Sequence, residues 1–356
     1  MNEQAVIGAI LGCAAGDALG LPMEGMPPRR QARMFPSLEG HCFLFGRGMV
    51  SDDTEHTLMS AQALIQSGGD PALFATLFAR KLRWWLLGLP SGAGPTTLRA
   101  TARLWMGYPP GASAVWSASN GPAMRAPVIG AAFGADRALM ARLVKASVTI
   151  TNADPKAYHG ALACALAAAM AAEAGPREHV TAQRFIEELE RLLADEPAGE
   201  FMALMARMAG AQRRGFSAAA FAAELGFARR GPTGCIFDTA PAALYAWLAN
   251  QGNVKNAVIQ AVRLGGDTDT IAAITGAITA AGTGEEGIPP DWIGGLFEWP
   301  RTVAHMREVG RRLAQTAAAG VAGRPVRLFT PALPLRNLFF LLVVLARGLR
   351  RLAPPY

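Results

Sequence analysis

The stretch 265-GGDTDTIAAITGAITAA-281 is the part of this 356-residue chain from which its fold and chemistry can best be worked out. Asp267 and Asp269 stand between a glycine pair and an apolar run that predicts a helix. Asp and Thr before such a run are ordinary helix caps. Carboxylate and hydroxyl oxygens, here with Thr270, are also the ligands that Mg²⁺ or Mn²⁺ prefers. Taken alone, the stretch fits a cap and half of a metal site equally well.

The composition predicts an all-α protein with a large core. Hydrophobic residues make up 51% of the chain and charged residues 17%. Alanine-rich runs such as 161–172 and 218–223 favour helix, and stretches that alternate apolar and polar residues are scarce. We expect helices over 5–21, 54–65, 71–87, 96–106, 136–148, 155–174, 179–195, 199–213, 217–226, 253–264, 271–281 and 302–319.

The cysteines and the N-terminus point to a cytoplasmic protein. The four cysteines show no CxxC spacing, which disfavours a zinc site and a disulfide framework. The N-terminus has no basic region before an apolar core, and Glu3 stands where a signal peptide would carry positive charge. We therefore expect a reducing compartment and no export.

The net charge of +7 belongs to the end of the chain. From Arg301 onward there are ten Arg, no Lys and one acid, Glu308, which is a charge of +9 and leaves −2 for the preceding 300 residues. A near-neutral body offers no broad basic face, so nucleic-acid binding is disfavoured.

The domain organisation follows from the absence of an internal linker. No repeat or low-complexity segment divides residues 1–290, which predicts one catalytic domain, and 291–356 form a basic, apolar C-terminal extension. Its uninterrupted apolar run, 338–346, would be about 14 Å long as a helix, too short for a hydrocarbon core of roughly 30 Å. Docking on the body or on a second subunit is the simpler interpretation, and contact with a membrane surface is the less favoured one.

A second acidic stretch, 51-SDDTEHT-57, precedes the helix expected over 54–65. Asp52 with Glu55 three residues later fits a capping box. Capping leaves Ser51 and Asp53 unexplained, and adjacent carboxylates repel unless a cation or solvent screens them. If the two acidic stretches converge, their four aspartates could hold two divalent cations. Gly265 and Gly266 would then provide the sharp turn that lets Asp267 reach a metal.

Three further segments have a composition that predicts local structure. Glycines recur every four residues from Gly8 to Gly20, which predicts close approach of another helix, while Asp17 suggests an ordinary solvated or capping acid. Residues 26–49 have the composition of a surface loop. The turn at Asn120 precedes a helix start whose N–H groups could hold phosphate, with Arg125 adding charge, although most loops of this composition are only loops.

Five motifs, in this order, resemble the ADP-ribosylglycohydrolase family, which includes dinitrogenase reductase-activating glycohydrolase. The resemblance covers roughly residues 5–285. The motifs are GAILGCAAGDALGLPMEG (8–25), SDDTEHT (51–57), SNGPAMRAPVIGA (119–131), GCIFDTAPAALYAW (234–247) and RLGGDTDTIAAITGAITAA (263–281).

The resemblance implies a compact, orthogonal multi-helix fold with two divalent cations, Mg²⁺ or Mn²⁺. It places the metal ligands at Ser51, Asp52, Asp53, Asp267, Asp269 and Thr270. It implies that Asp53 or Glu24 orients or deprotonates the attacking water, and that ADP-ribose is contacted at Asn120, Gly121, Met124, Gly266 and Cys235.

The function so implied is removal of ADP-ribose from a modified protein, arginine-linked by default. Serine-linked ADP-ribose, O-acetyl-ADP-ribose and an ADP-ribose-binding pseudoenzyme are the alternatives. The chain departs from the family pattern at Ser51, where Thr is common, at Asn152 and Asp154, where many relatives carry His, and at Cys235, where an aromatic residue often faces the adenine. Phe237 or Tyr245 could compensate for the last departure.

Overall fold

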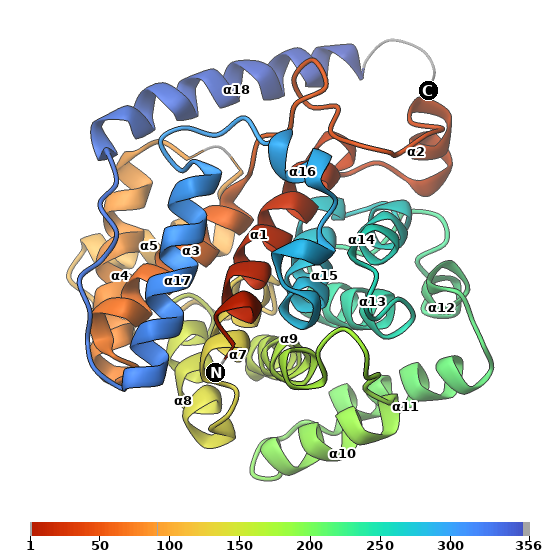
Figure 1. The fold of residues 1–356 in the computed structure, drawn as a ribbon, viewed down its shortest axis with the longest axis horizontal. Helices are drawn as coiled ribbons and strands as arrows, with labels where there is room; N and C mark the ends of the chain where they lie inside the picture. The colour runs from red at the N-terminus through yellow and green to blue at the C-terminus, as the bar shows by residue number, and fades with distance from the viewer. Residues whose placement is uncertain (1, 91, 352–356) are drawn as a thin grey trace.

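The structure, a computed structural model, describes residues 2–90 and 92–351. Among these residues there is no β-sheet, and pairing between extended segments is limited to isolated bridges such as Met26 with Gly266. The all-α prediction is confirmed. The elements, shown in Figure 1, are α1 (Glu3–Gly20), η1 (Leu21–Met23), α2 (Pro28–Met34), α3 (Asp52–Ser67), α4 (Pro71–Leu87), α5 (Pro95–Trp105), α6 (Gly121–Met124), α7 (Ala126–Phe133), α8 (Arg137–Val148), α9 (Pro155–Ala174), α10 (Ala182–Leu192), α11 (Gly199–Arg213), α12 (Ala218–Glu224), α13 (Ile236–Leu248), α14 (Val254–Arg263), α15 (Thr268–Thr283), η2 (Glu285–Gly287), α16 (Pro290–Gly294), α17 (Val303–Ala319), η3 (Thr330–Ala332) and α18 (Leu333–Arg350).

The centre of the fold is the pair α1 and α15, which lie side by side in Figure 1. A Cβ atom added at Gly16 would lie 2.1 Å from the Ala272 carbonyl oxygen, and one at Gly12 would lie 2.3 Å from that of Gly276. Gly8 and Gly20 make the same approach further along α1. Because any side chain would push the helices apart, the glycine spacing is what allows this contact. The predicted close helix approach is confirmed.

The helix α2 corrects the expectation that residues 26–49 form only a loop. The segment begins at Pro28, a residue suited to the first turn of a helix because its missing N–H needs no partner there. Gln31 is buried and donates from Nε2 to the Val262 carbonyl oxygen at 2.6 Å. This contact with α14 gives the short helix a tertiary anchor that local composition does not reveal.

In the part of the chain that the structure describes, three helical segments are long and apolar enough to cross a membrane, judged by length and composition alone: residues 3–23, 155–174 and 330–350. The first two are largely buried inside the protein, whereas only 22% of the third is buried. The run 338–346 alone predicts a segment too short to span a membrane. That prediction is wrong about length, because α18 continues to Arg350 and the 21-residue segment 330–350 has a mean hydropathy of 1.6.

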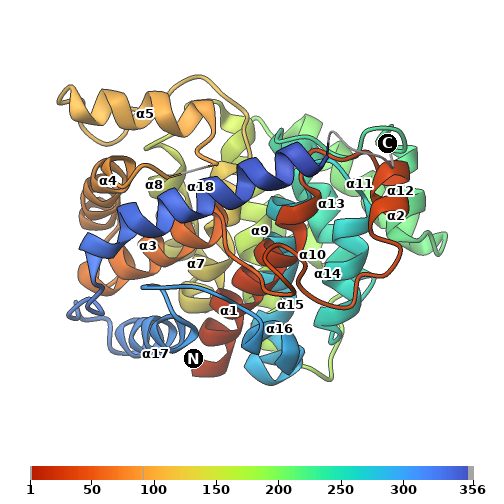
Figure 2. The ribbon, with the colours of Figure 1, turned by 90° about the horizontal axis from the view of Figure 1, so that it is seen from above.

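The helix α18 lies across the outside of the molecule, as Figure 2 shows. Its inward face buries Arg336, Asn337 and Phe340. The Phe340 ring packs on that of Phe43 with centroids 5.5 Å apart, and Asn337 donates from Nδ2 to the Gly88 carbonyl oxygen at 2.7 Å. The extension therefore contacts the body directly.

Candidate functional site

The two acidic stretches meet at the N-termini of α3 and α15. The Thr270 hydroxyl donates to Asp53 Oδ2 at 3.1 Å, which joins residues 217 positions apart. The Ser51 hydroxyl donates to the same oxygen at 3.2 Å. The expectation that these helix starts face each other is therefore confirmed.

The residue that positions the α3 start is Asp17 of α1. Its carboxylate accepts hydrogen bonds from the Ser51 N–H at 2.9 Å, from the Thr54 N–H at 3.2 Å and from the Thr54 hydroxyl at 2.6 Å. Asp17 is 0% exposed, so its interpretation as a solvated acid was wrong, and it caps the start of α3 rather than an end of its own helix. The available signal was that α1 is apolar on every side, which predicts burial of the whole helix.

The predicted capping box at α3 is also wrong. Ser51 is the N-cap, since its hydroxyl oxygen accepts from the Asp53 N–H at 3.2 Å. Glu55 turns away from the helix start, and its carboxylate accepts from the Trp85 indole N–H and from Arg301. Asp52 is therefore not needed as a cap.

The acidic cluster, which we define as Glu24, Asp52, Asp53, Asp267 and Asp269, is unfavourable without a counterion. Burial raises the pKa of Asp53 well above its usual range, and the charges of Asp17, Asp52 and Asp267 raise it further. Burial likewise raises the pKa of Asp269, with Glu24 and Asp267 adding to the effect. Like charges in a poorly solvated site oppose ionisation, and a divalent cation would reverse that effect.

The residues fit divalent cations by their donor chemistry. Asp53 Oδ1 is buried and has no hydrogen-bond partner, so it is free to bind a cation. Ser51, Asp52, Asp267, Asp269 and Thr270 add oxygen donors only, which suits hard cations. Within residues 2–90 and 92–351, however, no three His, Cys, Asp or Glu side chains are spaced as a ready-made metal group. Carboxylate rotamers can change when a cation binds, so side chains that are not yet grouped around a cation can still converge on one.

The loop around Asn120 lies against the α15 start. Asn120 Nδ2 donates to Asp267 Oδ2 at 2.7 Å and to the Thr239 hydroxyl at 2.9 Å. The Asn120 N–H donates to the Gly234 carbonyl oxygen at 3.0 Å, so this amide is not free to bind phosphate. Asn152, where the family pattern often has His, is buried and donates to the Ser117 carbonyl oxygen at 2.9 Å. Asn152 therefore helps to hold the loop before Asn120 in place.

Gly266 and Cys235 also lie beside this loop, whereas Met124 is withdrawn from it. Gly266 has φ +71°, and a Cβ atom there would lie 2.0 Å from the Pro232 carbonyl oxygen. Its own carbonyl oxygen accepts from the Gly25 N–H at 2.7 Å, which holds the chain next to Glu24. Cys235 pairs with Ser119 in an isolated bridge. The Met124 side chain is buried in the core, while Gly121 begins α6.

Two side chains that could have faced a ligand point elsewhere. Arg125 is 0% exposed and donates to the Ser147 hydroxyl at 2.8 Å, so the suggestion that it adds charge to a phosphate site was wrong. Tyr245 is buried, and its hydroxyl donates to the Phe216 carbonyl oxygen at 2.7 Å. It cannot compensate for the missing aromatic residue at Cys235.

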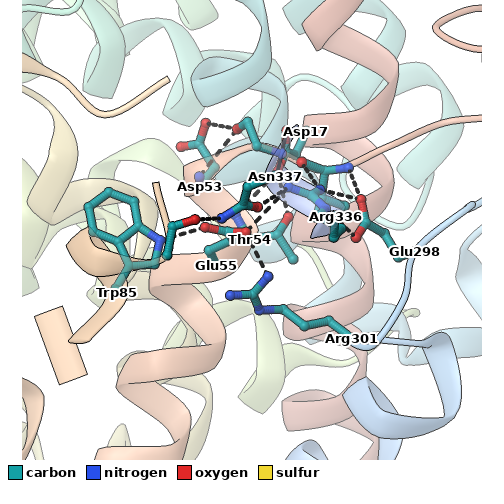
Figure 3. A network of polar contacts seen from close by, with 12 residues as sticks. Asp17, Asp53, Thr54, Glu55, Trp85, Glu298, Arg301, Arg336 and Asn337 are labelled. Carbon is teal, nitrogen blue, oxygen red and sulfur yellow. Dashed lines mark hydrogen bonds and ion pairs between the residues drawn. The ribbon is translucent and has the colours of Figure 1, made fainter. Parts of the chain in front are cut away.

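A buried ion-pair network behind the site, shown in Figure 3, was not foreseen. Arg336 of α18 donates to Glu298 and lies 3.4 Å from Glu55. Glu298 Oε1 accepts from the Val50 N–H at 2.8 Å, while Arg336 Nη2 donates to the Val50 carbonyl oxygen at 2.6 Å. The network therefore fixes the residue before Ser51. No local pattern could have signalled it, because Glu298 is 248 positions from Val50 and Arg336 is 281 positions from Glu55.

Comparison with known proteins agrees with this arrangement. A model of the ADP-ribosylglycohydrolase family matches residues 2–322. The ADP-ribosylarginine hydrolase Tri1 of Serratia proteamaculans is 28% identical over 310 residues, which cover 83% of this chain and 75% of that protein. The ADP-ribosyl-(dinitrogen reductase) glycohydrolase of Rhodospirillum rubrum is 26% identical over 295 residues, with 82% and 89% covered. A solved structure named "ADP-ribosylglycohydrolase-related protein complex" is 26% identical, with a TM-score of 0.63 and coverage of 88% of this chain and 98% of that one.

Proposed function

Because the chain belongs to the ADP-ribosylglycohydrolase family, a family of hydrolases of ADP-ribose linkages, we propose that it cleaves the glycosidic bond between ADP-ribose and a protein side chain with the help of divalent cations. Arginine is the acceptor we propose first, since the Serratia relative is named as an ADP-ribosylarginine hydrolase. The observation that carries the proposal is the meeting of the α3 and α15 starts through Asp53 and Thr270.

The metal ligands in this proposal are Ser51, Asp52, Asp53, Asp267, Asp269 and Thr270. Two ions, Mg²⁺ or Mn²⁺, would cancel the repulsion among these carboxylates. When bound, such ions orient the ribose hydroxyls and lower the pKa of a bound water.

The chain's own residues supply positioning and proton transfer. The bond that breaks joins the ribose anomeric carbon to the side-chain nitrogen, and a water oxygen forms the new bond at that carbon. The transition state has oxocarbenium character, which nearby carboxylates stabilise. Glu24 or Asp53 accepts the water proton, and the leaving nitrogen takes up a proton in exchange. Glu24 is exposed on one side, but the protein packed around its carboxyl group and the charge of Asp267 raise its pKa, which suits a group that exchanges protons.

In this proposal, ADP-ribose is bound by the loop at Asn120 and Gly121 together with Gly266 and Cys235. Asn120 is held by Asp267 and Thr239, so its position depends on the same α15 start that carries the acids. Met124 supports this loop from within the core.

The test is a release assay on arginine-linked and serine-linked ADP-ribosyl peptides and on O-acetyl-ADP-ribose, with Mg²⁺, Mn²⁺ or EDTA. Asp269→Asn should reduce release by at least about a hundredfold, as expected for loss of a group at the reacting centre. Asp195→Asn, at an exposed aspartate, is the matched control and should leave the rate unchanged. Full activity in Asp269→Asn or in EDTA would refute the proposal, and tight ADP-ribose binding with no release would identify a binding protein instead.

A further inference from the structure

The outward face of α18 is an apolar stripe. Its members lie at successive helical turns and are 41–70% exposed: Leu335, Leu338, Phe339, Leu342, Leu345 and Leu349. A soluble protein seldom leaves so many large apolar side chains together in water. Figure 2 shows the helix across the outside of the body, with its outward side free of other elements.

The orientation of this stripe is determined by polar contacts on the opposite side of α18. Arg336 is buried between Glu298 and Glu55, and Arg347 donates from Nε to the Phe43 carbonyl oxygen at 2.9 Å. At the C-terminal end, Arg351 donates to the Pro22 carbonyl oxygen at 2.8 Å. Turning the stripe inward would break all of these contacts. The way in which α18 binds to the body therefore keeps the stripe exposed.

Aromatic side chains from other segments extend the same surface. The Phe297 ring lies beside that of Phe339, with centroids 6.4 Å apart, and Trp299 beside Phe329 at 6.1 Å. Phe45 is 98% exposed at the tip of a turn, in the left-handed region at φ 47°. The same loop packs on α18 through Phe43. We call the stripe together with Phe45, Phe297, Trp299 and Phe329 the α18 surface.

The charge around the α18 surface is positive. The chain contains no acid after Glu308, while Arg327 precedes α18 and Arg347, Arg350 and Arg351 stand at its C-terminal end. An apolar helix face with basic residues near its ends, next to exposed aromatic residues, is the composition that binds the interface of an anionic bilayer.

We propose that the α18 surface binds an anionic membrane, with α18 lying in the plane of the interface. The helix is long enough to span a bilayer, but spanning would pull Arg336 from Glu298 and Glu55 and leave the buried Glu298 carboxylate without its cation, while of its two cations Glu55 would keep only Arg301. Self-association through the stripe is the other possible use of an apolar face. The protruding Phe45 turn favours a lipid surface over it, because a single exposed ring inserts among lipids more readily than it packs on a flat protein face.

The location of the surface gives it a functional consequence. Arg351, directly after α18, donates from Nη1 to the Glu24 carbonyl oxygen at 2.9 Å. A membrane bound along α18 would therefore lie beside the edge of the acidic cluster. The helix α18 lies outside residues 2–322, the part of the chain that matches the family model.

The test is sedimentation of the full chain with vesicles. Phosphatidylcholine vesicles containing about 30% phosphatidylglycerol should bind the protein, pure phosphatidylcholine vesicles should bind it more weakly, and raising the salt from about 50 mM to about 500 mM should weaken binding. Leu342→Glu should reduce binding by roughly tenfold or more, and Phe45→Ser by a smaller factor. Leu73→Glu, at an exposed leucine of α4, is the control and should bind like the parent protein.

Three results would overturn the proposal. One is a failure of the parent protein to sediment with anionic vesicles. Another is a dimer in light scattering that Leu342→Glu dissociates, with no vesicle binding, which would assign the surface to a second copy. The third is retention on vesicles after alkaline carbonate, which would indicate a spanning helix. Circular dichroism of each variant shows that the fold is intact.

Discussion

Replacing Arg336 by leucine should destabilise the protein by about 3 kcal/mol, because it removes one partner of a buried ion pair. The Arg336 side chain is 6% exposed and that of Glu298 is 1% exposed. Glu298 would keep only the Val50 N–H, whereas Glu55 would keep Arg301 at 2.7 Å and Trp85. We therefore expect the lower end of the range of about 3–5 kcal/mol for a broken buried pair.

The assay is urea unfolding followed by circular dichroism, with Arg312→Leu as the control. Arg312 forms an ion pair with Glu308 at 2.6 Å, but the two side chains are 36% and 31% exposed, so its loss should cost at most about 1 kcal/mol. A result for Arg336→Leu within about 1 kcal/mol of the control would refute the reasoning.

The pH dependence provides a second measurement on the same variant. Burial raises the pKa of Glu298 above 4.5 even though Arg336 lowers it, so removing Arg336 should raise the pKa further. A carboxyl group with a raised pKa keeps its proton in the folded state after the unfolded chain has released it. Stability from this group is therefore present below the unfolded pKa and is lost as pH rises through the folded one. The stability difference between variant and parent should grow as pH rises from the ordinary carboxyl range toward neutrality.

Three further predictions concern the acidic cluster and the helix pair beneath it. Asp269→Asn should raise the melting temperature in EDTA, because it removes one of several buried charges that repel one another. It should also abolish the further rise in melting temperature that Mn²⁺ produces in the parent protein. Calorimetry that shows the same Mn²⁺ response in both proteins would contradict the metal assignment. Gly16→Ala should destabilise the protein by about 1–3 kcal/mol in urea unfolding, because its Cβ would lie 2.1 Å from a backbone oxygen. Gly348→Ala, in open space on α18, is the control and should be neutral or stabilising. Equal effects of the two substitutions would argue against close packing of α1 on α15. Asp17→Asn should lower the rate of ADP-ribose release in a variant that is still folded at the assay pH, since the amide can accept fewer of the hydrogen bonds from Ser51 and Thr54. An unchanged release rate would show that the release reaction does not need this contact.

The helix positions were largely predictable because their signals are local. The helix α4 begins and ends at the expected residues, since Asp70 caps it through the Leu73 N–H and Pro71 follows in the first turn. The helix α9 likewise follows Asp154 and Pro155 and ends before Gly175. Helix caps and alanine-rich runs involve residues only a few positions apart. A short stretch of sequence is therefore enough to predict where such a helix begins and ends.

The ligand residues of the candidate site were predictable from the sequence, but the residues that hold them in position were not. The two aspartate stretches and the hydroxyls beside them were recognisable as oxygen ligands, and the family resemblance suggested that they converge. The burial of Asp17 and its role at the start of α3 were not recognised, because its partners, Ser51 and Thr54, are more than thirty positions away. The capping box at Asp52 was misassigned because Glu55 is drawn to Arg301 and Arg336 instead.

The sequence by itself determined where the helices lie, that glycines line one side of α1, and which oxygens could serve a metal. Only the tertiary structure decided that Asp17 holds the start of α3, that Arg336 anchors α18 to Glu298 and Glu55, and that the apolar stripe of α18 faces outward. The physical reason is that a helix forms from contacts within a few residues. The partner of a buried charge and the side of a helix that meets the body depend on how distant segments pack.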